Sequence, residues 1–272
     1  MSYYSVFGLK KEPFSTSPDP EFFYRSAGHE AALKRLEIAI RLRRGLSVIL
    51  GDVGAGKTTL SRALLEAFAG EEESFEFHLV FDPAFDSEQQ FLSRLVRSFG
   101  AGSGEGSSDQ LKEELEGYLL KRAGRQERIV TLVIDEGQKL TAANLEVLRT
   151  LLNYETNQYK LLQLVILAQM ELLAQIDTLR NFSNRVALKY VINPLDENET
   201  AAMIDFRLRV AGYSASEKLF EPAAARLIYQ NSQGCPRTIA MLCHNALELL
   251  VMNKQTRLDE KIVAEAIQRN HG

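Results

Sequence analysis

The sequence has no tryptophan, two cysteines and no long apolar run in its 272 residues. The cysteines, Cys235 and Cys243, have no CxxC partner and no nearby histidine pair, so neither a zinc site nor a disulfide framework is indicated. The longest apolar run, 164–168, is far shorter than the roughly 20 residues that span a bilayer, and the N-terminus lacks the pattern of a signal peptide. We therefore expect a cytoplasmic protein with reduced thiols and no membrane span of its own.

Positive charge is not in excess either. The net charge is −4 and the pI is near 5.7, so the chain as a whole lacks the basic field that concentrates nucleic acid. The densest basic stretch comprises Lys34, Arg35, Arg41, Arg43 and Arg44. A stretch of this kind is either a phosphate-tracking surface or the solvated side of a helix. Binding of a polyanion would therefore have to be local.

Strands and helices alternate over the first two thirds of the chain. Apolar periodicity and caps predict strands over 46–50, 75–81, 129–134, 161–168 and 186–192, and helices over 58–68, 87–99 and 111–122. The last three strands are continuous apolar runs, which is typical of parallel strands that are covered on both faces. After Pro194 only helices are predicted, over 198–210, 222–231, 236–252 and 259–269. We predict an α/β fold with an αβα domain that includes an N-terminal arm (1–193) and has its ligand site at the carboxyl edge of the sheet, followed by a helical domain (194–272).

The segment GDVGAGKT (51–58) matches the phosphate-binding pattern GxxxxGK[ST] and lies between a predicted strand and a predicted helix. Its glycines allow consecutive backbone N–H groups and the helix N-terminus to meet phosphates. Lys57 is predicted to reach the β- and γ-phosphates and Thr58 to ligate Mg²⁺ through its hydroxyl, whereas Thr59 has a structural alternative as an ordinary helix residue. The predicted nucleotide-binding residues are Gly51, Asp52, Val53, Gly54, Ala55, Gly56, Lys57, Thr58 and Thr59.

A second motif, IVTLVIDEGQ (129–138), places two acids directly after a buried strand. Alone, such a pair is also compatible with a helix cap. Together with the phosphate loop it predicts that Asp135 holds Mg²⁺ and that Glu136 accepts a proton from the water that attacks the γ-phosphorus. The cofactors predicted by the two motifs are ATP and Mg²⁺.

Four further polar positions are compatible with the same chemistry. Gln169 follows the predicted strand 161–168 and either orients the attacking water or is a plain strand-end residue. Arg180 and Arg185 precede the last strand, and Arg185 is the preferred arginine finger for a neighbouring subunit. Arg237, in GCPR (234–237), lies in a predicted first helical turn, where a cation is slightly unfavourable unless an anion is near.

These segments together resemble the ExeA/GspA ATPases, AAA+ proteins associated with type II secretion and pilus assembly. The resemblance rests on FGLKKEPFSTSPDPEFFY (7–24), GDVGAGKTTL (51–60), VIDEGQKL (133–140), the segment 151–172 and GCPR (234–237). Members of that family continue into a transmembrane helix and a periplasmic region that this sequence does not contain. The chain is therefore expected to be either the cytoplasmic part of such a protein or a stand-alone relative.

The resemblance implies an oligomeric ATPase with its nucleotide between sheet domain and lid. It implies the sensor 1 position for Gln169, the arginine finger for Arg185, sensor 2 for Arg237, and a leader that packs Pro13 and Phe14 near the adenine. It further implies a membrane-protein partner of a secretion or pilus system at the inner face of the bacterial inner membrane.

Alternative functions remain open at the level of the sequence. One is a DNA-associated AAA+ regulator similar to the transposition ATPases, for which the basic stretch is the supporting feature. Another is a nucleotide-sensing scaffold with negligible hydrolysis, against which the intact Lys57, Thr58, Asp135 and Glu136 argue. A kinase, with an acceptor other than water, agrees less well with the acid pair.

Overall fold

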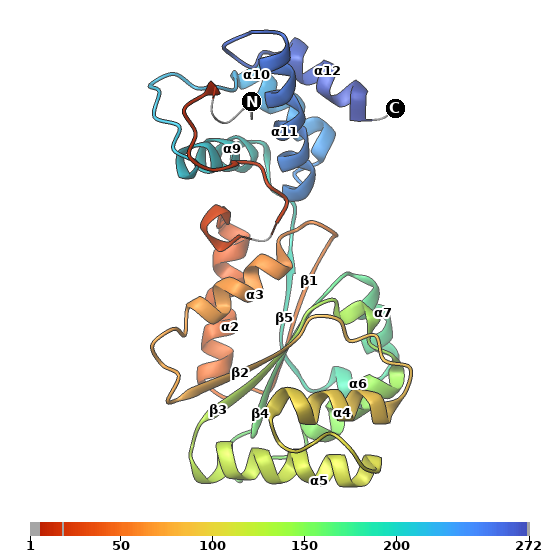
Figure 1. The fold of residues 1–272 in the computed structure, drawn as a ribbon. Coiled ribbons are helices and arrows are strands. Elements are labelled where there is room, and N and C mark those ends of the chain that lie inside the picture. The colour runs from red at the N-terminus through yellow and green to blue at the C-terminus, as the bar shows by residue number, and fades with distance from the viewer. Residues whose placement is uncertain (1–5, 18, 271–272) are drawn as a thin grey trace. The chain divides into compact units, whose positions relative to one another are not determined.

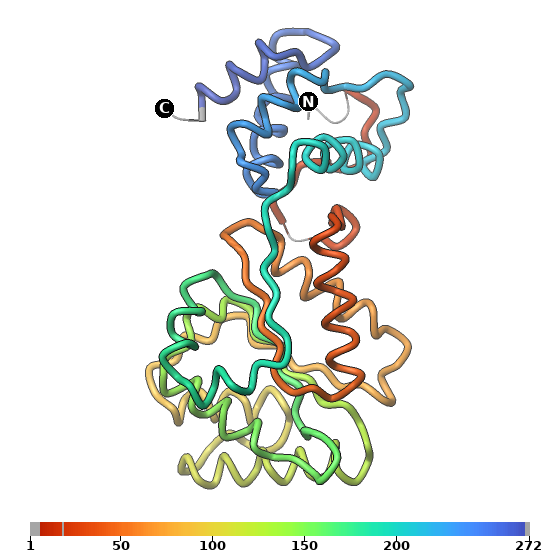
Figure 2. The backbone as a smooth tube through the Cα atoms, turned by 180° about the vertical axis from the view of Figure 1, so that it is seen from behind, coloured from red at the N-terminus to blue at the C-terminus, as the bar shows by residue number. Residues whose placement is uncertain are grey.

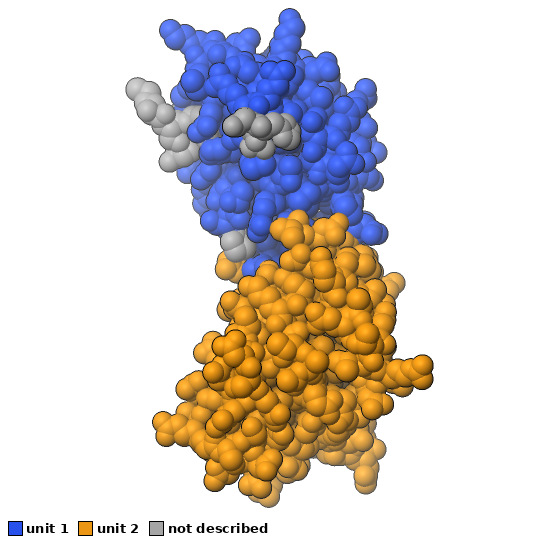
Figure 3. All heavy atoms as spheres, turned by 90° about the vertical axis from the view of Figure 1, so that its right-hand side faces the viewer, with its two compact units in different colours: residues 1–28, 54–59, 193–272 blue, residues 29–53, 60–192 orange. Residues whose placement is uncertain are grey.

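The computed structural model describes residues 6–17 and 19–270. Contacts divide the chain into two compact units, which are coloured separately in Figure 3. The first, here called the sheet unit, comprises residues 29–53 and 60–192. The second, here called the helical unit, comprises residues 1–28, 54–59 and 193–272.

The sheet unit is built on a parallel sheet of five strands in the order β2-β3-β4-β1-β5 (Figure 1). The strands are β1 (Leu46–Gly51), β2 (Phe75–Val80), β3 (Ile129–Ile134), β4 (Leu162–Ala168) and β5 (Val186–Ile192). All five predicted strands are confirmed to within one residue at each end. Because every neighbouring pair is parallel, the carboxyl ends of all five strands lie at one edge of the sheet.

The central strands are buried, as their continuous apolar sequences predict. Every residue of β1 and β4 is buried, and so is β3 after its first residue. The same expectation is wrong for β5, in which exposed and half-buried residues alternate up to the buried Ile192. β5 is an edge strand, so its outward side chains, including Lys189, reach solvent.

Helices cover both faces of the sheet, as the ribbon in Figure 1 and the view from behind in Figure 2 show. One face carries α2 (Ala27–Arg41) and α3 (Lys57–Glu66). The other packs α4 (Glu88–Phe99), α5 (Ser108–Leu119), α6 (Ala142–Leu151) and α7 (Glu171–Thr178) into one core with alternate residues of β1, β3 and β4. The predicted serine cap of α4 is confirmed, because the Ser87 side chain accepts from the N–H of Gln90.

The helical unit has four helices over residues 193–270. They are α9 (Glu197–Val210), α10 (Pro222–Ser232), α11 (Pro236–Met252) and α12 (Glu260–Asn270), each within one residue of its predicted bounds. α9 begins with a capping box between Asp196 and Glu199, and α10 and α11 begin with proline at the first helical position. Their apolar faces share one core.

The N-terminal arm packs into that core. The Phe14 ring is 1% exposed and lies edge-on to Phe220, with 5.9 Å between centroids. Arg207 of α9 donates to the Ser15 carbonyl over 2.9 Å and stacks over Phe22 of η1 (Pro20–Phe22). The Phe14 ring is thus enclosed by the helices of this unit, and the expectation that Pro13 and Phe14 pack near an adenine stays a prediction. The contacts also group the arm with the helical unit, whereas the predicted division into domains 1–193, with the arm, and 194–272 stays a prediction.

Candidate functional site

The phosphate-loop residues 51–58 connect β1 to α3. Gly51 is the last residue of β1, and Lys57, 7% exposed, is the first residue of α3. Gly54 and Gly56 have φ values of 81° and 88°, in the region that L side chains rarely adopt. Loop N–H groups followed by a helix N-terminus form an arrangement that suits a polyphosphate. The chain thus has the local backbone that the loop prediction requires.

Within the helical unit, Gly54 lies against the first turn of α11. A Cβ built on Gly54 would come within 2.7 Å of the Arg237 Cβ and 3.0 Å of the Cys235 Sγ. Cys235 is the N-cap of α11 and Arg237, which is exposed, follows the N1 proline. The structure therefore brings the predicted sensor 2 arginine next to the phosphate loop.

Within the sheet unit, three of the predicted site segments meet at one edge. β4 lies between β1 and β3, and the register pairs Leu50 with Ala168 and Ile134 with Ile166. The residues at or directly after the ends of these strands, Gly51, Asp135 and Gln169, therefore share the carboxyl edge of the sheet. Asp135 is 4% exposed and its N–H donates to the Val80 carbonyl over 2.9 Å. Proteins usually bind Mg²⁺ through one or two carboxylates, and a buried carboxyl group at this edge suits that role.

The backbone turns sharply at Glu136. Its φ of 56° and ψ of 35° are left-handed, an uncommon conformation for glutamate, and its N–H donates to Asp135 Oδ1 over 2.9 Å. The short helix η3 (Gly137–Lys139) follows. A Cβ on Gly137 would lie 2.4 Å from Ile166 Cγ2, so the turn is pressed against β4. The two acids consequently occupy a tightly constrained segment.

Gln138 is a polar residue of this segment that neither sequence motif assigns to the site. Its Nε2 donates to Glu136 Oε2 over 2.8 Å, and its Oε1 accepts from the Gln169 N–H over 3.1 Å. It is half-buried. The only sequence signal is its position two residues after the second acid, and that spacing does not disclose a partner 31 residues away.

The two candidate finger arginines belong to the segment of the sheet unit between β4 and β5. Arg185 directly precedes β5, whose first residue pairs with Leu46 at the amino end of β1, so it lies at the opposite edge of the sheet. The pKa of Glu146 is lowered, first by hydrogen bonds from Arg149 and in smaller part by the charge of Arg185. Arg180 is the exposed first residue of α8 (Arg180–Ser183). Arg185 therefore does not join the acids at the carboxyl edge.

The basic stretch around α2 makes contacts within its own unit. Arg41 forms two hydrogen bonds with Glu71 (2.7 and 2.8 Å). The guanidinium of Arg43 lies 4.0 Å from the Tyr159 ring centroid and donates to the carbonyl oxygens of residues 123 and 127. Arg35 lies over Tyr190, and Lys34 pairs with Glu30. Much of this charge is therefore engaged internally.

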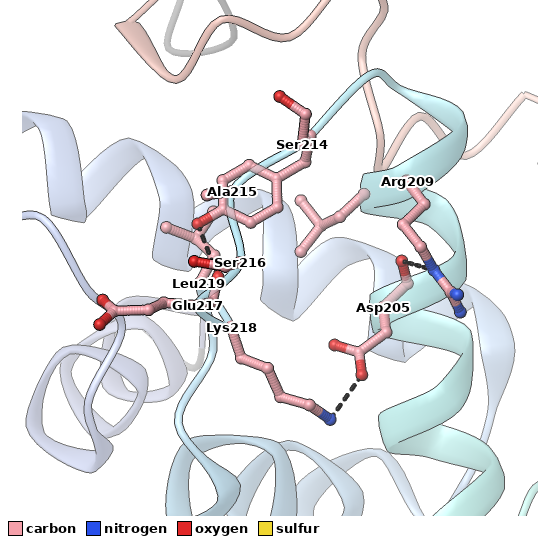
Figure 4. A pocket seen from close by; sticks show the side chains of 10 residues that line it. Asp205, Arg209, Ser214, Ala215, Ser216, Glu217, Lys218 and Leu219 are labelled. Carbon is pink, nitrogen blue, oxygen red and sulfur yellow. Dashed lines mark hydrogen bonds and ion pairs between the residues drawn. The ribbon is translucent and has the colours of Figure 1, made fainter.

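A separate pocket in the helical unit contains none of the predicted site residues. It has a volume of about 370 Å³ and is lined by the end of α9 and the segment 213–219 (Figure 4). Lys218 and Asp205 form an ion pair across it, with 2.6 Å between Nζ and Oδ2.

Among the described residues, no helix is long and apolar enough to cross a membrane.

Comparison with known proteins decides the family. Residues 40–176, about half of the chain, match the family described as the AAA domain. The chain belongs to the AAA domain family. It is 35% identical over 248 residues to general secretion pathway protein A of Aeromonas hydrophila, which confirms the resemblance expected from the sequence. That alignment covers 90% of this chain and 44% of the relative, so the chain spans less than half of that protein's length.

Solved structures support the fold assignment. The ORC2 protein of Aeropyrum pernix, in ADPNP-ADP complexes, superposes with a TM-score of 0.65 at 18% identity, covering 90% of this chain and 67% of that one. The ORC1 protein of Aeropyrum pernix, in complex with DNA, gives 0.67 at 18% identity, covering 95% and 69%. The predicted P-loop AAA+ fold is confirmed.

Proposed function

We propose that this AAA protein binds Mg²⁺–ATP in loop 51–58 and hydrolyses the ATP. The observation that carries the proposal is the shared carboxyl edge of β1, β4 and β3, where Gly51, Gln169 and the Asp135–Glu136 pair follow three adjoining strands. Ligands of open parallel sheets bind outside this edge. Nucleotide binding is also a property of the solved ORC2 relative.

The roles of the residues follow from what phosphoryl transfer requires. Lys57 contacts the β- and γ-phosphates, and the Thr58 hydroxyl and the Asp135 carboxylate are the side chains that hold Mg²⁺. Magnesium, when bound, neutralises charge that develops on the phosphate oxygens. Glu136 accepts a proton as water attacks the γ-phosphorus; the bond from the γ-phosphorus to the bridging oxygen breaks, giving ADP and phosphate. Gln169 contacts the γ-phosphate or the attacking water.

Two arginines extend this site. Arg237, beside Gly54 at the start of α11, supplies positive charge toward the nucleotide and lets the helical unit respond to it. Arg185 acts in trans, in the nucleotide site of a second copy, with Arg180 as the alternative. The protein therefore works as a homo-oligomer.

The kinship with general secretion pathway protein A supports a cellular role. We infer a cytoplasmic ATPase that drives an assembly step of the type II secretion or pilus kind, through a membrane-protein partner at the inner face of the bacterial inner membrane. The second candidate is a DNA-associated regulator, favoured by the likeness to the DNA-bound ORC1 fold. It ranks second because Arg41 and Arg43 are engaged within the sheet unit.

The test is ATP turnover measured against protein concentration, with Mg²⁺ or EDTA and with or without duplex DNA. The proposal predicts Mg²⁺-dependent turnover that rises with protein concentration and is indifferent to DNA. Strong stimulation by DNA supports the regulator instead. Tight ATP binding without turnover at any concentration contradicts hydrolysis and favours a nucleotide-sensing scaffold.

A further inference from the structure

We propose that Gln138 is a positioning residue that fixes the Glu136 carboxylate and couples it to Gln169 at the end of β4. The proposal rests on the proposed function, because the group it positions is the base for ATP hydrolysis. Gln138 has one hydrogen bond to each partner, at 2.8 Å to Glu136 Oε2 and 3.1 Å from the Gln169 N–H.

The chemistry of the two partners determines the orientation of the Gln138 amide. A backbone N–H can only donate, so the atom that faces Gln169 must be the side-chain oxygen. The NH₂ group then faces Glu136, whose ionised carboxylate can only accept. A rotated amide would place donor against donor and acceptor against acceptor. Gln138 is therefore satisfied at both ends in one orientation only.

Glu136 needs such a partner because its own geometry does not fix its carboxylate. Its backbone is held in the left-handed region, and its side chain is half-buried with three rotatable bonds. A hydrogen bond to an ionised carboxylate is stronger than one between neutral groups. Donation from Gln138 thus restricts the rotamers of Glu136, and misplacement of a catalytic group by about 1 Å costs up to about a hundredfold in rate.

The other bond of Gln138 connects the base to β4. Gly137 is packed so closely on Ile166 and Ala168 that no Cβ fits, which keeps η3 fixed on this strand. Gln169, the residue directly after β4, is the one proposed to contact the γ-phosphate. A shift of the Gln169 backbone is therefore transmitted through a single side chain to Glu136.

Two substitutions separate these bonds. Gln138→Met retains the length of the side chain and removes both hydrogen bonds. Gln138→Glu retains an acceptor for the Gln169 N–H, removes the donor and places a second carboxylate beside Glu136. Gln175→Met, on the exposed surface of α7, is the matched control.

We expect kcat to fall about tenfold in Gln138→Met, because one hydrogen bond to a charged group corresponds to a factor of about that size. KM for ATP should stay within about twofold of the wild-type value. Gln138→Glu should lose at least as much, and Gln175→Met should lose nothing. In a Glu136→Gln background, Gln138→Met should cause no further fall in kcat. Hydrogen exchange at the Gln169 amide should accelerate in Gln138→Met and stay slow in Gln138→Glu.

The outcomes are distinguishable. A kcat that stays at the wild-type value in Gln138→Met, or that is restored in Gln138→Glu, overturns the inference while leaving the proposed function intact. Unchanged exchange at Gln169 in Gln138→Met also overturns it, whatever the turnover. Absent turnover in the wild type overturns the proposed function, and the positioning role with it, even where the exchange data reproduce the hydrogen bond.

Discussion

Gly54 and Arg237 lie so close together that a Cβ on the glycine would come within 2.7 Å of the Cβ of the arginine. The φ of Gly54, 81°, is in the left-handed half of the Ramachandran plot. Both the backbone conformation and the space therefore require glycine at this position. The contact joins Gly54 of the phosphate loop to the first turn of α11. A change in conformation at Gly54 therefore displaces that turn.

We expect Gly54→Ala to destabilise the fold and weaken ATP binding about tenfold or more. A left-handed alanine costs about 1–2 kcal/mol, and the clash with Arg237 and Cys235 adds about 1–3 kcal/mol. Gly70→Ala is the matched control, because its φ is 88° but nothing lies within 4 Å of its added Cβ. Denaturant unfolding and ATP titration check both variants. Equal effects in the two would contradict a specific role for the contact.

The N-terminal arm is expected to be necessary for the stability of the helical unit. Phe14→Ala should cost about 3–5 kcal/mol in unfolding free energy, because it leaves a cavity beside Phe220. Phe81→Ala is the matched control, since that ring is 52% exposed, and it should change stability by no more than about 1 kcal/mol. Chemical denaturation measures both. A Phe14→Ala protein as stable as the control would mean that the arm does not belong to this core.

The partly buried His78 predicts a loss of stability on the acid side. Burial lowers the pKa of His78 below 6.5, while the charge of Glu76 opposes the shift. In the range between the lowered folded-state pKa and 6.5, the unfolded chain therefore binds a proton that the folded chain does not. Stability in this range decreases as the pH decreases, by at most about 1.4 kcal/mol per pH unit. His78→Gln should have a shallower slope between pH 7 and 5 in denaturation experiments. At pH 8 histidine is neutral in both states, so the unfolding free energy of each protein at pH 8 is the reference for its own change toward pH 5. Identical changes in wild type and His78→Gln would contradict the prediction.

A trans-acting arginine finger predicts complementation between inactive variants. Arg185→Ala and Glu136→Gln should each turn over ATP slowly, yet a mixture should regain activity, because one kind of interface combines an intact Glu136 with an intact Arg185. The same mixing experiment with Arg180→Ala tests the alternative arginine. No recovery with either variant would contradict a finger in trans.

The fold was largely predictable because its signals are local. The apolar run 129–134 and the proline-initiated helix at 236 are read from neighbouring residues, and both have their predicted bounds. The alternating exposure of β5 was not predictable, since it depends on the absence of a second neighbouring strand rather than on the sequence of the strand.

The site was predictable only in part, for the same physical reason. The loop 51–58 and the acids after β3 carry recognisable spacing, whereas the bond from Gln169 to Gln138 joins residues 31 apart and depends on the pairing of β3 with β4. The contact of Ser15 with Arg207 spans 192 residues, so the arm's place in the helical core had no local signal.

The proposed ATPase depends on Lys57 for ATP binding and on Glu136 for ATP hydrolysis. The most direct measurement compares ATP affinity and single-turnover hydrolysis in wild type, Lys57→Ala and Glu136→Gln. We predict that Lys57→Ala loses binding, whereas Glu136→Gln binds ATP as tightly as wild type and hydrolyses it at least about a hundredfold more slowly. Wild-type hydrolysis in Glu136→Gln, or unchanged ATP binding in Lys57→Ala, would contradict the roles proposed for these two residues.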